Sequence, residues 1–433
     1  MKKDALYELN GKISPLRVLP YSLQQILAMF VSNIVPIGII AAAARPSLSQ
    51  EEILVLIQNA MIAAGIATFL QATPIWRLGG GLPIFMGVSF TFVVPMSVIA
   101  AKYGYDAVVG TVLAGGFFEG ILGLTMRHWR RAIAPIVSAV VVTGIGLSLL
   151  STAARSFGGG FAQDFGSMSN LMIGIVTLLV SLLWQVFMKG NKKRLAILAG
   201  LAAGYVTALL FGKINFTITG HWFALPKLLP YTPEFRPDAI LSICIIYLVS
   251  ATETMGDASA LVSGVLHRDI TPKELSGTLA VDGFGSLLGG CLGVSPVTSY
   301  SENIGLTIMT GVANCQVARV GALIMALCGL FPPIGQFMQT IPLPVIGGVL
   351  LLVIGQILVS GFQMIAEAGF TPRNKLIASV SMAMGIGFTT STEAGIWNAF
   401  PAAIQSIFAQ NVVSVIFVVA LLMNLLLPKQ MET

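Results

Sequence analysis

Long apolar runs alternate with short polar connections along almost the whole chain. A helix needs about 20 apolar residues to cross the hydrocarbon of a bilayer, and most of the runs approach or exceed that length. The longest connection, 212–237, separates them into two sets of seven. The runs lie at about 18–44, 53–73, 82–101, 106–126, 132–151, 169–188, 194–212, 238–265, 275–293, 296–312, 316–335, 342–361, 374–389 and 408–427. The pattern predicts an all-α membrane protein with 14 transmembrane segments.

The composition agrees with a membrane protein and argues against an enzyme. Charged residues make up 10% of the chain and hydrophobic residues 55%, with a mean hydropathy of +0.87, whereas a soluble domain is roughly a quarter charged. The four cysteines lie in apolar segments without metal-ligand spacing, and no Ser/His/Asp set, zinc motif, haem ligand pair or phosphate-binding loop is visible. We therefore expect neither enzymatic activity, nor a metal, nor a cofactor.

Basic side chains are concentrated in every second connection. Of the 24 lysines and arginines, 18 fall at the termini or in alternate connections, and 6 fall in the others. Cytoplasmic loops are enriched in Lys and Arg, so both termini are expected in the cytoplasm and the number of spans is expected to be even. This distribution explains the net charge of +6 without a nucleic-acid partner.

Seven spans in each half would place the second half upside down relative to the first, as in the inverted repeats of many transporters. The third and tenth segments are both interrupted by Gly, Pro and Ser, and Pro83 and Pro296 lie 213 residues apart. We expect a short extended piece and then a short helix in each, with both helix N-termini aimed at a common point. The alternative is a pair of glycine-rich kinks that bind nothing.

Several carboxylates lie inside the apolar segments, where an ionisable residue indicates a functional site. Glu253 and Asp257 are one helical turn apart on one face. Two acids this close at membrane depth cannot both stay charged cheaply, so at least one is expected to hold a proton near neutrality. Glu302 lies in the tenth segment and Asp282 in the ninth. The alternatives are permanently protonated packing acids and, for Asp257 and Asp282, structural hydrogen bonds to backbone.

Three further polar residues are harder to interpret. Glu119 has no acidic neighbour in the sequence, which favours a structural role, and Glu393 is expected near the outer end of its span. The roles of both are left open. Gln25, in the first span, could hydrogen-bond a substrate or bridge two helices.

Four motifs resemble those of the nucleobase–ascorbate transporters, also called the second nucleobase–cation symporter family, and in particular its bacterial xanthine and urate permeases. The stretch Glu302-Asn-Ile-Gly-Leu-Thr-Ile-Met-Thr-Gly311 is similar to the family signature, which also falls in the tenth span. The order and spacing agree over essentially the whole chain. The other three motifs are Leu23-Gln-Gln25-Ile-Leu-Ala-Met-Phe30, Gly87-Val-Ser89-Phe90 and Ser250-Ala-Thr-Glu253-Thr-Met-Gly-Asp257.

The resemblance implies roles for individual residues. Glu253 and Glu302 would accept hydrogen bonds from the N–H groups of a nucleobase ring, and Phe90 would offer a backbone contact. Proton coupling would rest on Asp257, Asp282 and Glu253. The substrate-binding residues implied in this way are Gln25, Ser89, Phe90, Glu253, Ser301, Glu302 and Asn303.

The resemblance also implies two domains and a homodimer. A core domain would combine residues 1–131 (spans 1–4) with 238–337 (spans 8–11). A gate domain would combine 132–237 (spans 5–7 and the outer loop) with 338–433 (spans 12–14). Alternating access would arise as the core rocks against the gate.

Two departures from the family pattern affect the expected substrate. Gln25 stands where many relatives have His, and Ser89 stands where some xanthine carriers have Asn. We expect a secondary active transporter that imports an oxidised purine, xanthine or urate, with protons across the cytoplasmic membrane. The alternatives are a uracil:proton symporter and an uncoupled nucleobase channel or facilitator.

Overall fold

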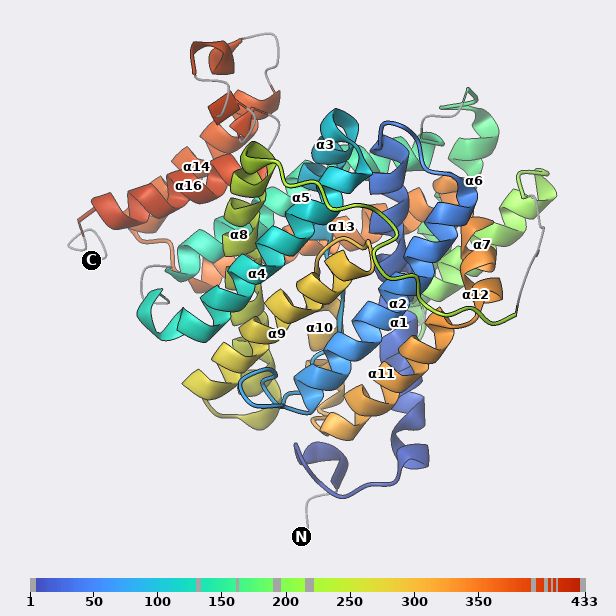
Figure 1. The fold of residues 1–433 in the computed structure, drawn as a ribbon, viewed down its shortest axis with the longest axis horizontal. Helices are drawn as coiled ribbons and strands as arrows, with labels where there is room; N and C mark the ends of the chain where they lie inside the picture. The colour runs from blue at the N-terminus through green and yellow to red at the C-terminus, as the bar shows by residue number, and fades with distance from the viewer. Residues whose placement is uncertain are drawn as a thin grey trace.

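The computed structural model describes residues 5–129, 134–160, 163–189, 196–214, 222–390, 395–400, 404–405, 408–409 and 412–428. The described chain is mostly helical (Figure 1). Its described part also contains one two-stranded sheet between segments far apart in sequence. Glu393 lies outside the described residues, and so does the side chain of Glu302.

The elements follow the predicted order of apolar segments closely. In chain order they are η1 (Ala5–Tyr7), α1 (Pro15–Ala43), α2 (Gln50–Ala72), β1 (Met86–Val88), η2 (Phe90–Phe92), α3 (Val93–Tyr103), α4 (Tyr105–Trp129), α5 (Pro135–Gly158), α6 (Met168–Phe187), α7 (Ala196–Leu210), α8 (Pro237–Leu261), η5 (Val262–Leu266), α9 (Pro272–Cys291), β2 (Val297–Ser299), α10 (Ser301–Thr310), α11 (Cys315–Gly329), α12 (Pro332–Gln339), α13 (Leu343–Glu367), α14 (Pro372–Thr390), η7 (Ile396–Ala399) and α16 (Val412–Leu426).

Several helices are long and apolar enough to cross a membrane by themselves. Within the described residues there are six of them: Gln50–Ala72, Tyr105–Met126, Pro135–Gly158, Met168–Phe187, Pro237–Leu266 and Leu343–Glu367. Shorter apolar helices include Ala196–Leu210, Cys315–Gly329 and Val412–Leu426. A helical membrane protein with several spans is confirmed, and the full count of 14 stays a prediction.

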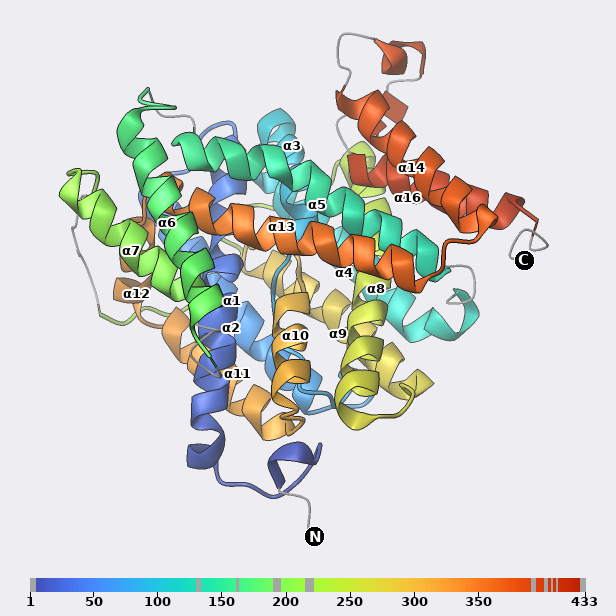
Figure 2. The ribbon, with the colours of Figure 1, turned by 180° about the vertical axis from the view of Figure 1, so that it is seen from behind.

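The helices pack in two groups. In the first, α4 packs along α9 and α8, and α2 and α1 pack along α11. In the second, α5 lies beside α13, α6 beside α7, and α14 beside α16; Figure 2 shows the α5–α13 pair crossing the front of the molecule. The groups touch where α8 packs against α5 and α16. The expected domain boundary after residue 337 falls inside α12, which packs on α2 and α11.

The crossing of α4 and α9 is unusually close. A Cβ atom added to Gly283 on α9 would lie 2.1 Å from the backbone nitrogen of Gly120 on α4 and 2.8 Å from the carbonyl carbon of Glu119. Small residues allow helix backbones to approach in this way inside membranes. The contact brings the backbone of Glu119 next to the residue that follows Asp282.

One predicted segment is divided in the structure. The apolar run at 316–335 covers all but the first residue of one helix and the start of another, because α11 (Cys315–Gly329) ends at Gly329 and α12 begins at Pro332. Proline suits the first turn of a helix and disfavours helical geometry in the residue before it, so Pro332 and Pro333 start a new helix. The predicted segment thus corresponds to α11, and only its last residues belong to α12.

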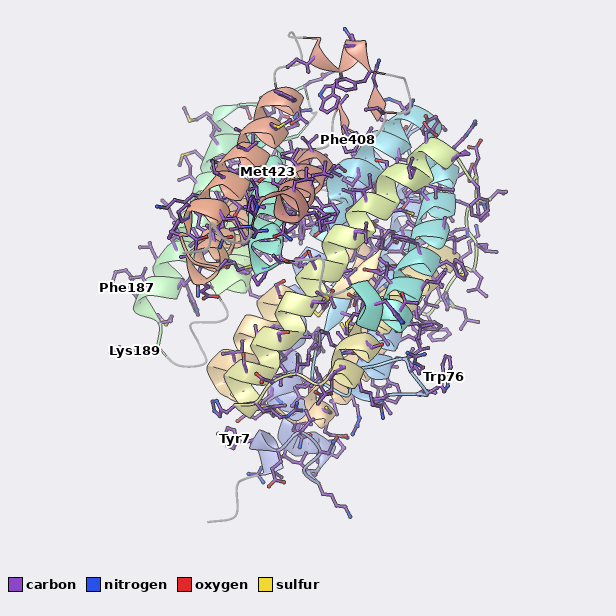
Figure 3. The ribbon with its side chains drawn as sticks, turned by 90° about the vertical axis from the view of Figure 1, so that its left-hand side faces the viewer. Tyr7, Trp76, Phe187, Lys189, Phe408 and Met423 are labelled. Carbon is purple, nitrogen blue, oxygen red and sulfur yellow. The ribbon has the colours of Figure 1, made fainter. Side chains whose placement is uncertain are left out.

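Figure 3 shows where three residues outside the long helices lie along the molecule. Tyr7, before α1, and Trp76, after α2, lie toward one end, whereas Phe408, between α14 and α16, lies at the opposite end. The predicted topology assigns Tyr7 and Trp76 to one side of the membrane and Phe408 to the other, and this assignment stays a prediction.

Candidate functional site

The two interrupted segments meet as a small antiparallel sheet. Strands β1 and β2 pair with Met86 opposite Ser299 and Val88 opposite Val297. The pairing continues beyond them, because the Ser89 N–H donates to the Pro296 carbonyl at 3.0 Å. The extended pieces expected in spans 3 and 10 are therefore present, and they bind each other.

Side chains from the first two helices complete the hydrogen bonding of this sheet. Asn33 Oδ1 accepts from the Val88 N–H at 2.7 Å, and Thr68 Oγ1 accepts from the Met86 N–H at 2.9 Å. The Tyr300 hydroxyl donates to the Val88 carbonyl at 2.7 Å. Non-helical backbone at membrane depth needs such partners. No motif in the sequence marks these three residues, although Asn33 and Thr68 are polar positions within apolar helices.

Gly87 lets the sheet lie close against α1. A Cβ atom at this position would come within 2.6 Å of Asn33 Oδ1, 2.7 Å of a Tyr300 ring carbon and 2.9 Å of the Met29 methyl carbon. Real Cβ atoms essentially never come that close to neighbouring atoms, so only glycine fits here without moving the strand.

Each strand leads directly into a short helix. After β1 the chain forms η2 and then α3, and the Ser89 hydroxyl oxygen accepts from the Thr91 N–H at 3.3 Å. After β2 the chain forms the ten-residue α10, which begins at Ser301. The first amides of a helix have no partner within the helix and carry partial positive charge. The two half-length helices thus present polar ends beside the sheet, one from each half of the chain.

Glu253, on α8, lies between these two helix starts. Thr91 Oγ1, in η2, donates to Glu253 Oε2 at 2.9 Å, and Ser301 Oγ, at the start of α10, approaches Glu253 Oε1 at 3.4 Å. The carboxylate is half-buried. Sequence reasoning identified Glu253 and Ser301 but missed Thr91, which follows directly after Ser89 and Phe90.

Asp257 contacts the same serine one helical turn away. Ser301 Oγ donates to Asp257 Oδ2 at 2.8 Å, and Ser299 Oγ lies 3.4 Å from the same oxygen. A serine has one hydroxyl hydrogen, so Glu253 and Asp257 compete for the Ser301 donor. The two acids therefore lie on one face of α8, as their spacing predicts, and their role in a functional site stays a prediction.

Asp282 lies deeper and is joined to Asp257 through hydroxyl groups. Its side chain is fully buried, and Thr254 Oγ1 donates to its Oδ2. Thr254 Oγ1 is also 3.0 Å from Ser299 Oγ, which contacts Asp257. Two hydroxyls therefore connect a half-buried acid beside the helix starts to a buried acid behind the sheet.

Gln25 and Asn303 fasten α10 to α1. Gln25 Nε2 donates to Thr307 Oγ1 at 2.9 Å, and Asn303 Nδ2 donates to the Gln25 carbonyl at 3.0 Å. The side-chain amide nitrogen of Gln25 thus bridges two helices, which is one of the two roles that the sequence left open. Gln25 Oε1 and Asn303 Oδ1 are buried and have no hydrogen-bond partner within the described structure. Contact of either residue with a substrate stays a prediction.

The arrangement suits a flat ligand that carries both N–H and C=O groups. Glu253 and Asp257 supply carboxylate acceptors, whose bonds with N–H donors are charge-assisted and strong. The first amides of α10 have no partner within that helix and are candidate donors for carbonyl oxygens, whereas the Thr91 N–H of η2 already donates to Ser89. Phe90 begins η2 and is only partly buried. Glu302 is the second residue of α10, but its side chain lies outside the described part of the structure.

Comparison with known protein families and relatives gives matches over nearly the full length. Residues 16–394 match the sequence profile of the xanthine/uracil permease family. The chain is 32% identical to xanthine permease XanQ of Escherichia coli K12 over 446 residues, covering 98% of this chain and 94% of the relative. It is 29% identical to uric acid permease PucJ of Bacillus subtilis, covering 92% and 90% of the two chains.

Solved structures with a similar fold are also membrane transporters. The transmembrane domain of the cyanobacterial bicarbonate transporter BicA superposes with a TM-score of 0.61 at 15% identity, covering 90% of this chain and 97% of that domain. Murine Solute Carrier 26 family member A9, an anion transporter in an inward-facing state, gives a TM-score of 0.62 at 12% identity over 93% of this chain and 68% of its own. At this identity the likeness concerns the fold alone.

Proposed function

The chain belongs to the xanthine/uracil permease family, and on that premise we propose that it imports an oxidised purine, xanthine or urate, together with protons. It is thus a multi-pass membrane transporter and not an enzyme. The relatives named as xanthine and uric acid permeases favour a purine over uracil. The import direction and the proton coupling belong to the proposal.

The observation that carries the proposal is the position of Glu253 between the starts of two half-length helices. Its carboxylate faces Thr91 of η2 and Ser301 of α10. Xanthine and urate are flat and are rimmed by alternating N–H donors and C=O acceptors. In our proposal Glu253 and Glu302 accept the ring N–H groups, while the amides of Phe90 and of the first turn of α10 serve the carbonyls.

Selectivity follows from the same geometry. A site built to accept N–H groups rejects an analogue that lacks one, because a buried carboxylate then loses its partner. Ser89 and Asn303 act here by holding η2 and α10 in place, since Ser89 caps η2 and Asn303 bonds the Gln25 carbonyl.

Proton coupling arises from the shared donor at Ser301. Glu253 and Asp257 both approach this hydroxyl. When one acid is protonated, the other, still charged, accepts the Ser301 hydrogen bond. A charged Glu253 binds ring N–H groups best, and a protonated Asp257 removes the repulsion beside it. Proton and substrate binding then favour each other, and this coupling is reciprocal.

For the whole molecule we propose 14 spans in two inverted repeats, a core of residues 1–131 and 238–337, and a gate of 132–237 and 338–433. The two packing groups of helices support this division. The core carries the site and rocks against the gate in a homodimer in the cytoplasmic membrane, with both termini in the cytoplasm.

The test is uptake of radiolabelled xanthine and urate by cells that express the protein, with and without a protonophore. We expect uphill uptake of one purine, little competition by uracil, and loss of accumulation with the protonophore. Glu253→Gln is expected to abolish uptake, whereas the exposed acid Glu367 on α13 provides the matched control Glu367→Gln. Uptake by Glu253→Gln at the wild-type level would overturn the assignment of the site. Preferred uptake of uracil, or flux indifferent to the protonophore, would favour the uracil symporter or the uncoupled facilitator instead.

A further inference from the structure

Glu119, on α4, is a fully buried acid without a visible partner. Its side chain is 0% exposed, and neither carboxylate oxygen has a hydrogen-bond partner within the described structure. A buried polar group normally finds a partner, and an unpartnered carboxylate is far more costly than a neutral group. The high free-energy cost of burying an unpartnered carboxylate in a membrane-spanning helix requires an explanation.

The groups around Glu119 are acceptors or hydroxyls from two neighbouring helices. Asp282, on α9, interacts with it electrostatically, and the Gly283 contact holds their backbones together. Glu253 and Tyr247, on α8, also lie within electrostatic range. Ser250 Oγ, on α8, lies beside Glu119, and like Asp282 Oδ1 it is buried without a hydrogen bond of ordinary geometry within the described residues.

No cation balances this group within the part of the chain that the structure describes. The ion pairs found there are Lys102–Asp238, Lys213–Asp164, Arg236–Glu234 and Arg268–Glu274. None of them includes Glu119 or Asp282. In a medium of low dielectric constant, two neighbouring carboxylates repel each other strongly if both are charged. One of the two acids therefore keeps its proton.

We propose that Glu119 is a further proton-binding residue of this transporter, and that it shares one proton with Asp282. When a proton binds, the Glu119 carboxylate becomes a carboxylic acid, and its O–H donates to the free Oδ1 of Asp282. The Ser250 hydroxyl donates to the remaining oxygen of Glu119. Every buried polar atom named above then has a partner, and the pair carries one negative charge instead of two.

This residue extends the proton site beyond the substrate-binding acids. Asp282 is already joined to Asp257 through Thr254 and Ser299, so Glu119 forms the inner end of the series. It lies on α4, whereas the acids beside the helix starts lie on α8. The inference rests on the proposed function, because a bound proton contributes to transport only in a proton-coupled carrier.

A spectroscopic test shows whether Glu119 is protonated, and it requires no substrate. Infrared spectra of the purified protein, recorded in H₂O and D₂O, report the C=O stretch of protonated carboxyl groups. We expect Glu119→Gln to lose one such band relative to wild type, whereas the control Glu367→Gln keeps it. A carboxylic-acid spectrum unchanged by Glu119→Gln would overturn the proposal.

A transport test then shows whether binding of this proton is coupled to xanthine transport. We expect Glu119→Gln to lower proton-driven xanthine accumulation in proteoliposomes about tenfold more than it lowers xanthine exchange, within the usual range of coupling free energies. Glu119→Asp, which keeps a titratable group, should recover accumulation. Equal losses of accumulation and exchange, without recovery in Glu119→Asp, would overturn the coupling role. Dependence of accumulation on sodium instead of on pH would overturn the choice of a proton.

The two tests separate this inference from the proposed function. If the wild type takes up neither xanthine nor urate, the proposed function fails, yet the infrared comparison still reports whether Glu119 holds a proton. If the wild type accumulates xanthine and Glu119→Gln does so equally, the proposed function stands and the coupling role of Glu119 fails.

Discussion

A few hydroxyl groups determine how the carboxylates of this site are held. Glu253 and Asp257 compete for the single Ser301 hydroxyl hydrogen, and Thr91 provides a donor to Glu253 alone. Asp282 receives its donor from Thr254. Short hydroxyl side chains therefore orient all three acids, and their removal tests the site without changing its charge.

At the residue scale we predict that Thr91→Val weakens substrate binding. Loss of the 2.9 Å hydrogen bond to Glu253 frees the carboxylate to rotate. A hydrogen bond to a charged group contributes about 1.5 kcal/mol, so the KM for xanthine should rise about tenfold. Uptake kinetics measure this effect, and Thr91→Ser, which keeps the hydroxyl, is the matched control. A KM unchanged in Thr91→Val would contradict the orienting role.

The sequence predicts part of this site because some of its geometry is local. Glu253 and Asp257 are four residues apart on one helix, so their common face follows from the helical repeat alone. The approach of Glu119 to Asp282 depends instead on how α4 crosses α9, at a glycine 164 residues further along the chain than Glu119 itself. Glu119 has no acidic neighbour in sequence, so its acidic neighbour in space could not be predicted.

At the scale of elements, we predict that the strand pair tolerates no side chain at Gly87. Gly87→Val would force atoms against Asn33, Tyr300 and Met29 and push β1 away from α1. Overpacking of this kind costs about 1–3 kcal/mol, so we expect a lower melting temperature and loss of uptake. Gly38→Ala on α1, where an added Cβ meets nothing within 4 Å, is the control. Normal uptake by Gly87→Val would show that the close fit is unnecessary.

The Asn33 side chain gives a second prediction for this element. Its Oδ1 accepts from the Val88 N–H at 2.7 Å, and its side chain is 1% exposed. Asn33→Ala leaves that amide without a partner in a dry environment, at a cost of about 1–3 kcal/mol. We expect reduced thermal stability of the purified protein and weaker substrate binding. Asn33→Asp keeps the acceptor oxygen, and it should retain more binding than Asn33→Ala if the hydrogen bond is what matters.

The strands themselves could be predicted from the sequence, but their pairing could not. Gly, Pro and Ser interrupt the third and tenth segments and exclude a continuous apolar helix, so an extended piece follows from local chemistry. The pairing of Met86 with Ser299 joins residues from different halves, and no local pattern specifies it. The division at Pro332 falls inside the apolar run at 316–335, where Pro332 and Pro333 are the local signal for the end of α11.

At the scale of the whole molecule, the segment 222–236 and the connection after α2 lie toward opposite ends of α2. The segment 222–236 contacts the first half of α2. The Tyr231 hydroxyl donates to Glu52 Oε1 at 3.3 Å in the first turn, and Asn59 Nδ2, near the middle of the helix, donates to the Lys227 carbonyl at 2.9 Å. Trp76 follows the end of the same 23-residue helix. A helix of that length spans about 34 Å, which is close to the thickness of the hydrocarbon core.

This geometry turns the predicted orientation into an experiment. With both termini in the cytoplasm, Trp76 faces the cytoplasm and Leu228 faces the outside; both are well exposed, at 78% and 70%. The four native cysteines are buried or half-buried and are replaced by serine to remove background. We expect a membrane-impermeant maleimide to label Leu228→Cys in intact cells and Trp76→Cys only in inverted vesicles. The reverse pattern would place both termini outside, and labelling of both positions from one side would contradict the spanning of α2.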